Sequence, residues 1–347
     1  MMTRIAVLLA LTLGLAAQAM ASPVSPSFNV LIYHHVDTGT PPSTSVTPAQ
    51  FREHLEYFRD NGFNVVPIDQ AVDAVLGRNN ATLPEKALVI TFDDAYRSVY
   101  TEAFPLLKEF DMPATAFINT EPMDAGRSLW MTWDQAREMH EWGIVIANHT
   151  TDHENLMNYY DGDEQAWVDA VAENIRTAQR RIEEEIGEAP PYFAYPYGEY
   201  TEAIADMIRD EGYIGFAQHS GGVYSGSDFR GVPRFSADGI YASLNTLPTK
   251  LASKPMPVDY DTVPEMLTTD RQPSMTIRVR DMSDMTQNLN CFVNSEWTDA
   301  EWVSSDTFRL AAQEPLRDGR NRFNCTSRSR TGNFFYWYSQ PWVVVSE

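Results

Sequence analysis

Residues 87–92 form an almost wholly apolar run, Ala-Leu-Val-Ile-Thr-Phe, which leads directly into two adjacent carboxylates, Asp93 and Asp94. A short apolar run with β-branched members predicts a buried strand. Unpaired charges are costly to bury, so both aspartates should lie just past the C-terminal end of that strand. In barrels and open α/β sheets, this edge gathers ligands and catalytic groups. Taken alone, the pair is more often a simple cap for a helix, here predicted over residues 97–110.

The chain from residue 28 to about residue 253 alternates short apolar runs with amphipathic segments. Strands are predicted over residues 28–33, 63–66, 87–92, 114–118, 144–147, 192–195, 213–217 and 232–235. Helices are predicted over residues 48–61, 68–76, 97–110, 133–142, 164–186 and up to residue 211, with capping boxes at Thr47 and Thr132. Repeated β-then-α units predict a parallel sheet with right-handed crossovers, closed or nearly closed.

Five chemically active side chains each follow one of these predicted strands. They are His34, Asp93, Asp94, His149 and Tyr197. Because parallel strands end at the same edge of a sheet, we expect these side chains to meet there. Structural histidines and aspartates would not be expected to line up in this way, so the convergence favours a functional site.

Two imidazoles four positions apart, His149 and His153, can reach one metal ion from a helical turn or a tight loop. Together with a carboxylate from the neighbouring strand end, they give three protein ligands and one open position, which describes a catalytic zinc site. The second carboxylate of the Asp93-Asp94 pair can then act as a base on the metal-bound water. The same ligands also suit a non-haem iron oxygenase, which we rank below hydrolysis because these ligands lie on β/α units.

The net charge of −22, from 48 acidic and 26 basic residues, argues against nucleic-acid binding, which needs a basic face. Such a surface attracts cationic ligands or products, and a salt-tolerant habitat explains it equally well.

The first 21 residues read as a secretory signal peptide. Arg4 precedes an apolar run over residues 5–17, and Ala19-Met20-Ala21 gives a small-x-small cleavage site. We therefore expect an exported protein, periplasmic or secreted, with no integral membrane segment after cleavage. In such an oxidising compartment, the two cysteines of the chain, Cys291 and Cys325, are predicted to form a disulfide.

The character of the sequence changes after about residue 254. Residues 255–264 are crowded with proline, threonine and aspartate and predict a linker. Alternating runs follow, which predict a small all-β, sandwich-like domain over residues 265–347. Its many aromatic residues are more often core than an exposed sugar-binding ladder. The expected organisation is thus a catalytic α/β domain over residues 27–254 and a β domain after it.

Three motifs in this chain resemble those of the polysaccharide deacetylases of the NodB-homology type, carbohydrate esterase family 4. They are Thr91-Phe92-Asp93-Asp94, His149-x-x-x-His153 and Tyr195-Pro196-Tyr197-Gly198, and the resemblance covers roughly residues 28–242. It implies a distorted (β/α) barrel and a metal-dependent removal of acetyl groups from a polysaccharide. It also implies Zn2+ as the cofactor, with Co2+ or Ni2+ as alternatives.

The resemblance assigns roles to individual residues. Asp93 is similar to the family's general base, and Asp94, His149 and His153 are similar to its metal ligands. Tyr197 falls where the family lines the acetyl pocket and donates a backbone N–H to the oxyanion, an interaction worth about 3 kcal/mol in the transition state. Substrate binding is accordingly expected at Tyr195, Pro196, Tyr197 and Trp133.

The chain departs from the family pattern at two positions. Many members carry an arginine just before the Pro-Tyr-Gly motif, where this chain has Phe193-Ala194-Tyr195, so Arg234 is our substitute for the charge that holds the base. Many members also carry a C-terminal histidine that protonates the leaving amine, whereas this chain has none after His219.

The segment Tyr33-His34 resembles an arrangement in periplasmic poly-N-acetylglucosamine deacetylases, in which the acid histidine lies N-terminal. We therefore expect His34 to be the general acid, with His35 as the competitor, because neighbouring residues in an extended chain point to opposite sides. The remaining histidines are expected to be structural or surface groups; they are His54, His140 and His219.

The expected activity is removal of acetyl groups from an N-acetylated polysaccharide, such as poly-N-acetylglucosamine, a chitin-like polymer or a peptidoglycan glycan. An acetyl ester such as acetylated xylan is the nearest alternative substrate. A carbohydrate-binding protein without turnover is less favoured, because a pure binder needs no base beside the metal. No obligate protein partner is evident in the sequence.

Overall fold

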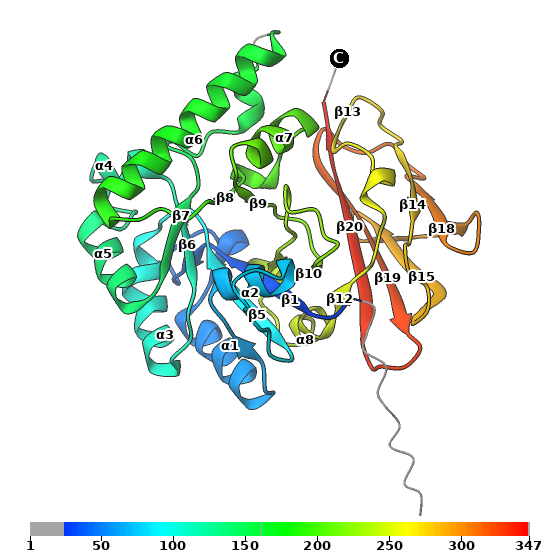
Figure 1. The fold of residues 1–347 in the computed structure, drawn as a ribbon, viewed down its shortest axis with the longest axis horizontal. Helices are drawn as coiled ribbons and strands as arrows, with labels where there is room; N and C mark the ends of the chain where they lie inside the picture. The colour runs from blue at the N-terminus through cyan, green and yellow to red at the C-terminus, as the bar shows by residue number, and fades with distance from the viewer. Residues whose placement is uncertain (1–23, 161, 346–347) are drawn as a thin grey trace, which may run out of the picture.

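The computed structural model describes residues 24–160 and 162–345, and it shows an α/β region with a β-rich region packed against it (Figure 1). The signal peptide expected over residues 1–21 lies outside the described residues. Within the described ranges, no helix combines the length and the apolar character needed to cross a membrane.

A curled sheet forms the centre of the α/β region and runs in the order β10-β1-β5-β6-β7-β8-β9 (Figure 1). Its strands are β1 (Ser27–Tyr33), β5 (Ala87–Phe92), β6 (Thr115–Ile118), β7 (Val145–Asn148), β8 (Tyr192–Ala194), β9 (Ile214–Phe216) and β10 (Gly222–Tyr224), with β4 (Asn64–Val65) beside β5 and β11 (Phe235–Ser236) beside β1. Only β10 runs antiparallel to its neighbour among the described strands of this sheet. The predicted distorted (β/α) barrel is confirmed.

The helices pack around the outside of this sheet. They are α1 (Pro48–Asp60), α2 (Ile68–Leu76), α3 (Phe104–Phe110), α4 (Thr120–Asp124), α5 (Trp133–Trp142), α6 (Glu164–Ile186), α7 (Glu202–Asp210) and α8 (Leu247–Ala252). Both predicted capping boxes are present, at Thr47 and at Thr132. The helix predicted over residues 97–110 is divided, because a π-helical turn over Val99–Ala103 precedes α3. The short helix α4 was not predicted.

Strand β5 is buried along its whole length, which explains its nearly continuous apolar sequence. Leu88 and Ile90 pack in the cluster that includes α1 and α3, whereas Val89 packs in a separate cluster on the opposite face. Thr91 is the one polar residue of the strand, and its hydroxyl donates a hydrogen bond of 2.8 Å to the carbonyl of Leu31. The aspartates therefore follow a strand that has no solvent-exposed face.

The C-terminal region is built from two sheets that share one apolar core. The larger sheet contains β12 (Lys254–Pro255), β13 (Leu267–Thr268), β15 (Met285–Val293), β16 (Glu296–Thr298), β19 (Gly319–Ser329) and β20 (Phe335–Val344). The smaller contains β14 (Ser274–Arg278), β17 (Glu301–Trp302) and β18 (Thr307–Ala311). The predicted sandwich-like β region is confirmed.

The segment over residues 255–264, which we expected to be a linker, is part of the packed structure. Pro255 pairs with Trp337 of β20, and the side chains of Met256 and Val258 are buried in the core of the β region. The ring of Trp337 also contacts Phe235 of β11, with ring centroids 5.3 Å apart. Proline and aspartate predicted an irregular backbone, but the two buried apolar side chains attach this segment firmly to the β region.

Cys291 and Cys325 lie opposite each other on β15 and β19 and form the predicted disulfide, at a sequence separation of 34. The double variant Cys291→Ala, Cys325→Ala should lower the free energy of unfolding by about 2–4 kcal/mol, because the unfolded chain loses a cross-link. Chemical denaturation followed by tryptophan fluorescence measures this loss. A reductant should destabilise the unsubstituted protein by a similar amount and leave the variant unchanged. Equal stability of the two proteins in the absence of reductant would contradict the prediction.

Candidate active site

The residues expected at the C-terminal edge of the sheet do meet there. Asp94 follows β5, and its Oδ1 atom lies 3.3 Å from Nε2 of His149, which follows β7. The same Oδ1 lies 3.0 Å from Nε2 of His153, and Oδ2 of Asp93 lies 3.8 Å from Nε2 of His149. The ring of His153 contacts that of Tyr197, which follows β8, with centroids 4.8 Å apart.

Asp94, His149 and His153, called the ligand set below, can hold a metal ion, because their ligand atoms all lie within 4.8 Å of one another. The backbone carbonyl of Ala194 accepts a 2.7 Å hydrogen bond from Nδ1 of His149. This bond places the proton on Nδ1 and turns the lone pair of Nε2 towards Asp94, which is the usual arrangement of a metal-binding histidine.

The ligand set fits a divalent cation on electrostatic grounds. Oδ1 of Asp94 and Nε2 of His149 are both buried, and neither has a hydrogen-bond partner among the described residues. A carboxylate oxygen and an imidazole lone pair that face each other are acceptors only, so a cation or additional protons must lie between them. Two histidines and one aspartate suit zinc and also the other divalent ions of the first transition row.

The carboxylate of Asp93 is held in place by Arg234, as we expected from the sequence. Nη1 and Nη2 of Arg234 donate to Oδ1 and Oδ2 of Asp93 at 2.7 and 2.8 Å, and both side chains are fully buried. Burial raises the pKa of Asp93, but the charge and hydrogen bonds of Arg234 outweigh it and hold the pKa below its usual value. Asp93 is therefore ionised near neutral pH, in the form that can accept a proton.

His34 follows β1, and its Nδ1 donates a 2.7 Å hydrogen bond to Oδ2 of the buried Asp238. Burial lowers the pKa of His34, but the hydrogen bond and charge of Asp238, with smaller contributions from Asp94 and Asp93, raise it to about 9. His34 therefore carries a proton at neutral pH. An aspartate that orients a histidine and stabilises its protonated form is also found in serine hydrolase triads.

His35 occupies a different environment. Its ring stacks on Tyr96 with centroids 3.5 Å apart, and it lines a cavity of about 420 Å³ that also borders Arg97 and Glu102. Burial lowers the pKa of His35, so this residue is neutral where His34 is charged. The two neighbouring histidines thus face different surroundings, as expected for an extended chain.

The backbone around the ligand set adopts an unusual conformation. Asp94, Ala95, Thr150, His153 and Tyr197 have φ angles of 76°, 56°, 70°, 59° and 60°. For a residue with a Cβ atom, this left-handed region costs about 1–2 kcal/mol. Such strain persists only where surrounding contacts hold it in place, and it tends to occur at functional sites. Here it clusters on the loops that carry the ligand set and Tyr197.

No residue with a side chain can replace Gly198 in the turn that carries Tyr197. It has a φ angle of 72°, and a Cβ atom built on it would lie 2.5 Å from the backbone nitrogen of Gln218. Only glycine therefore allows the turn to pack this closely against the segment after β9.

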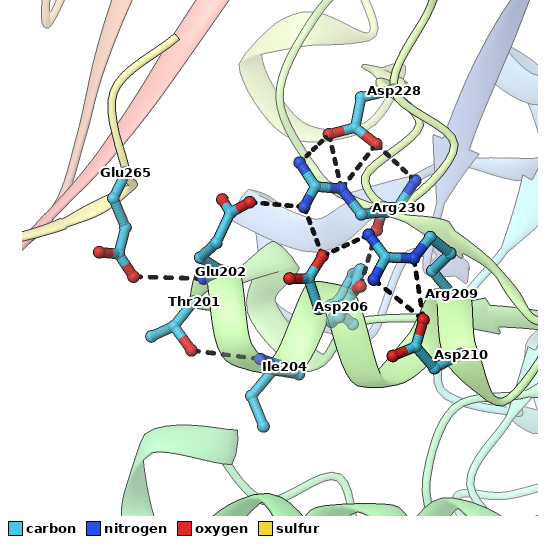
Figure 2. Close-up of polar contacts among 10 residues, drawn as sticks. Thr201, Glu202, Ile204, Asp206, Arg209, Asp210, Asp228, Arg230 and Glu265 are labelled. Atoms are coloured by element: carbon cyan, nitrogen blue, oxygen red, sulfur yellow. Dashed lines mark hydrogen bonds and ion pairs between the residues drawn. The ribbon is translucent and has the colours of Figure 1, made fainter. Parts of the chain in front are cut away.

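The turn is also linked to a network of ion pairs through Tyr195, the residue at its start. The hydroxyl of Tyr195 donates to the carbonyl of Arg230 at 2.7 Å. The guanidinium of Arg230 in turn binds Asp228 and, on α7, Glu202 and Asp206 (Figure 2). These contacts join the loop after β10 to the helix that follows the turn.

The β region also reaches the turn. Nη1 of Arg320, on β19, donates to the carbonyl of Tyr197 at 3.3 Å, and its guanidinium lies 5.7 Å from the centre of the Tyr197 ring. Nε of Arg320 lies 3.4 Å from Glu199, which accepts a 2.6 Å hydrogen bond from Asn155, two residues after His153. One residue of the C-terminal sheet therefore contacts the turn of Tyr197 directly and is linked to the loop of His153 through Glu199.

Three residues expected to bind substrate do not present their side chains to the site. Trp133 packs in the core, where its indole nitrogen donates to Asp124 at 2.8 Å and Arg181 lies over its ring. Tyr195 and Pro196 are buried beneath the turn. In contrast, the side chain of Tyr197 is 39% exposed beside the ligand set. Trp133 begins α5, and its ring packs into the apolar core and not towards the ligand set.

The other three histidines take different positions. His54 is buried, with ring nitrogens bonded to the hydroxyl of Tyr33 and the carbonyl of Ala242. His140 lies on α5, with Nε2 at 3.7 Å from the exposed Glu188, and His219 follows β9 and lines a cavity that borders no member of the ligand set. All three agree with the expected structural or surface roles.

Sequence reasoning missed three groups of the site. Asp238 follows the end of β11, so the rule that singled out the other strand-end residues could have found it. The carbonyl of Ala194 belongs to the backbone and has no signal in the sequence. Arg320 lies 123 positions from Tyr197, and nothing in the local pattern connects the two.

Comparison with known proteins agrees with this geometry. Residues 80–215 match the family model described as polysaccharide deacetylase. This segment is similar to a polysaccharide deacetylase domain. It contains Asp93, the ligand set and Tyr197, whereas His34, Arg234 and Asp238 lie outside it. The resemblance seen in the sequence motifs is thereby confirmed.

Relatives of the polysaccharide deacetylase domain extend the likeness. The poly-beta-1,6-N-acetyl-D-glucosamine N-deacetylase of Escherichia coli (strain K12) is 28% identical over 301 residues, which cover 73% of this chain and 44% of that protein. The chain thus spans less than half the length of this relative.

Two solved structures share the fold of the polysaccharide deacetylase domain. A de-N-acetylase from Aggregatibacter actinomycetemcomitans gives a TM-score of 0.58 at 25% identity, covering 65% of this chain and 99% of that one. IcaB from Ammonifex degensii gives a TM-score of 0.54 at 26% identity, and the match covers 65% of this chain and 96% of that one.

The Asp238→Asn variant should lower the pKa of His34, because the amide removes the charge that keeps this imidazole protonated. An opposite charge in hydrogen-bond contact shifts a pKa by about 1–3 units, so the basic limb of the kcat/KM profile should move to lower pH by that amount. NMR titration of the histidine resonances gives the pKa of His34 directly. The exposed Asp261 provides the control, and Asp261→Asn should leave both profiles unchanged. An unchanged pKa in Asp238→Asn would show that Asp238 does not set the charge of His34.

Proposed function

We propose that this chain is a metal-dependent hydrolase that removes acetyl groups from an N-acetylated polysaccharide of the poly-N-acetylglucosamine kind. One observation carries the proposal: the strand ends that carry the ligand set also carry a carboxylate, Asp93, held ionised by Arg234, and an imidazole, His34, held protonated by Asp238. The site therefore offers a base, an acid and a position for a Lewis acid. The substrate for which the Escherichia coli relative is named supports this substrate class.

Zinc is the ion that we propose for the ligand set, with Co2+ or Ni2+ as substitutes. When bound there, it polarises the acetyl carbonyl and lowers the pKa of water towards ~7. Asp94, His149 and His153 hold it, and the bond from His149 to the carbonyl of Ala194 fixes the coordinating nitrogen of that ring. The apolar core beneath the ligand set keeps the site dry on its inner side.

Asp93 acts as the general base in this proposal. Its Oδ2 atom lies 3.8 Å from Nε2 of His149, so a water molecule bound beside the ligand set is within reach of the carboxylate. Arg234 keeps Asp93 ionised and fixes both of its oxygens, so that the carboxylate accepts the proton of the attacking water without turning. A side chain in this role contributes about 10²–10⁴-fold.

His34 acts as the general acid. Expulsion of an amine from an amide requires a proton as the C–N bond breaks, and His34 holds one because Asp238 binds its Nδ1. Its other nitrogen, Nε2, is the proton donor. The backbone N–H of Tyr197 is the proposed oxyanion donor, in a turn that Gly198 and Arg320 hold in place. We propose that the protein works after export, as the N-terminal sequence suggests.

Acetate release tests the activity. Purified protein should release acetate from N-acetylglucosamine oligomers of β-1,6 linkage, lose this activity with a chelator, and regain it with zinc. Chitin oligomers and acetylated xylan serve as the competing substrates. The His153→Ala variant should lose both bound zinc and activity, whereas His140→Ala should keep both. Full zinc occupancy in His153→Ala would refute the ligand set, and acetate release only from xylan would identify an esterase.

The His34→Ala variant tests the role of His34 as proton donor independently of metal binding. It should lose about two to four decades of activity on N-acetyl substrates. It should keep its zinc, and it should lose less activity on an activated acetyl ester, whose leaving group needs no proton. Kinetics on both substrates, together with metal analysis, measure this pattern.

The neighbouring His35→Ala variant serves as the matched control. It should do less harm on the amide, because its ring stacks on Tyr96 and lies in a different cavity. If His34→Ala kept the basic limb of the pH profile and near-normal turnover of the amide, the role of general acid would pass to His35.

A further inference from the structure

A cavity of about 300 Å³ lies directly beside the ligand set. Asp94, His153 and Tyr197 form its border with the site, and Asn119 and Trp130 are also among its lining residues. A volume of this size is at the lower end of the range for small-ligand pockets, so it suits a single sugar ring. None of the steps proposed above uses Asn119 or Trp130.

Asn119 does not perform the usual task of an asparagine at its position. It is the N-cap residue of α4, where an asparagine side chain normally accepts a hydrogen bond from the helix backbone, yet no such bond is present. The N–H groups of Thr120 and Glu121 donate instead to the carbonyls of Thr150 and Thr151, at 3.4 and 2.7 Å. The loop that carries the histidines therefore caps α4, and the amide of Asn119 is free for another role.

The free amide is a costly feature. Asn119 is 2% exposed, and its Oδ1 atom has no partner among the residues that the structure describes. A buried polar group without a hydrogen bond normally costs about 1–3 kcal/mol. Most such groups in proteins have partners, so an exception inside a functional cavity points to a ligand.

Trp130 supplies a second group of the same kind. The main chain of Trp130 pairs with Tyr96, and the two rings lie 5.8 Å apart at the edge of the cavity. Its indole Nε1 is buried, and no hydrogen-bond acceptor for it exists within residues 24–160 and 162–345. An indole N–H can only donate, whereas an amide can donate from one end and accept at the other.

We propose that Asn119 and Trp130 bind hydroxyl groups of a sugar ring of the polysaccharide beside the ligand set, an inference that rests on the proposed function. A sugar hydroxyl both donates and accepts, so it can satisfy the indole N–H and either end of the amide. The aromatic edge formed by Tyr96 and Trp130 gives the ring an apolar contact. These two residues thus make the site specific for glycans, since a simple acetyl ester has no hydroxyl for them to bind.

The test compares two substrates in two variants. Trp130→Phe keeps the aromatic ring and removes only the N–H, and Asn119→Ala removes the amide. For each variant, kcat/KM is measured on an N-acetylglucosamine oligomer and on p-nitrophenyl acetate. The ratio of the oligomer value to the ester value should fall about 2- to 12-fold in each variant, mostly through KM, because each loses one neutral hydrogen bond to substrate.

The control is Trp302→Phe on β17, which removes an indole N–H that donates to the carbonyl of Gln287 at 2.7 Å, far along the chain from the site. It should leave the ratio unchanged. An unchanged ratio in Trp130→Phe would overturn the proposal. Equal losses on both substrates would also overturn it, because they would indicate a disturbed ligand set.

Calorimetric titration with the same oligomer separates this proposal from the proposed function. If the unsubstituted protein releases no acetate from any glycan, the proposed activity fails. In that case, weaker oligomer binding by Trp130→Phe than by the unsubstituted protein would still support the sugar site. Equal binding by the two proteins, or none by either, would refute it.

Discussion

The buried ion pair of Asp93 and Arg234 is the interaction on which the rest of the site depends. The guanidinium binds both oxygens of Asp93, the hydroxyl of Thr91 and the carbonyl of Ala217, and it lies 5.4 Å from the ring of Phe117. These partners come from β5 and the residue after it, from β6, and from the residue after β9, so Arg234 crosses the interior of the barrel. Breaking such a pair by removing one partner typically costs about 3–5 kcal/mol, because the other charge remains buried alone.

This pair explains how a carboxylate can stand at the end of a strand that has no exposed face. Without Arg234, burial would favour the protonated form of Asp93, and a protonated acid cannot serve as a base. A similar logic governs His34, because Asp238 keeps a proton on its ring. The two ion pairs have opposite effects, and each keeps one side chain in the charge state that hydrolysis of an amide requires. The strained loops of the ligand set and Tyr197 are stabilised by contacts with α4 and β19.

Much of the fold and most of the ligand set could be predicted from the sequence, because both depend on local patterns. The run before Asp93 specifies a strand, and the spacing of His149 and His153 specifies two imidazoles within reach of one ion. The residues that were wrongly predicted or missed share a different cause. Trp133 lies next to polar loops in the sequence, yet its helix packs it into the core. Arg320 comes from a separate sheet, and only the three-dimensional packing of the β region brings it to Tyr197.

The division of the site between shared and flanking segments bears on how such a protein can be rearranged in evolution. The segment that matches the family model, residues 80–215, carries the ligand set and the proposed base. The proposed acid, His34, comes before it, and Arg234 and Asp238 come after it. Recombination that exchanged the common segment alone would transfer a cation site whose base has lost its counter-charge and whose acid is missing. The smallest part of this chain that can be inherited as a working unit therefore begins at β1 and extends at least to Asp238.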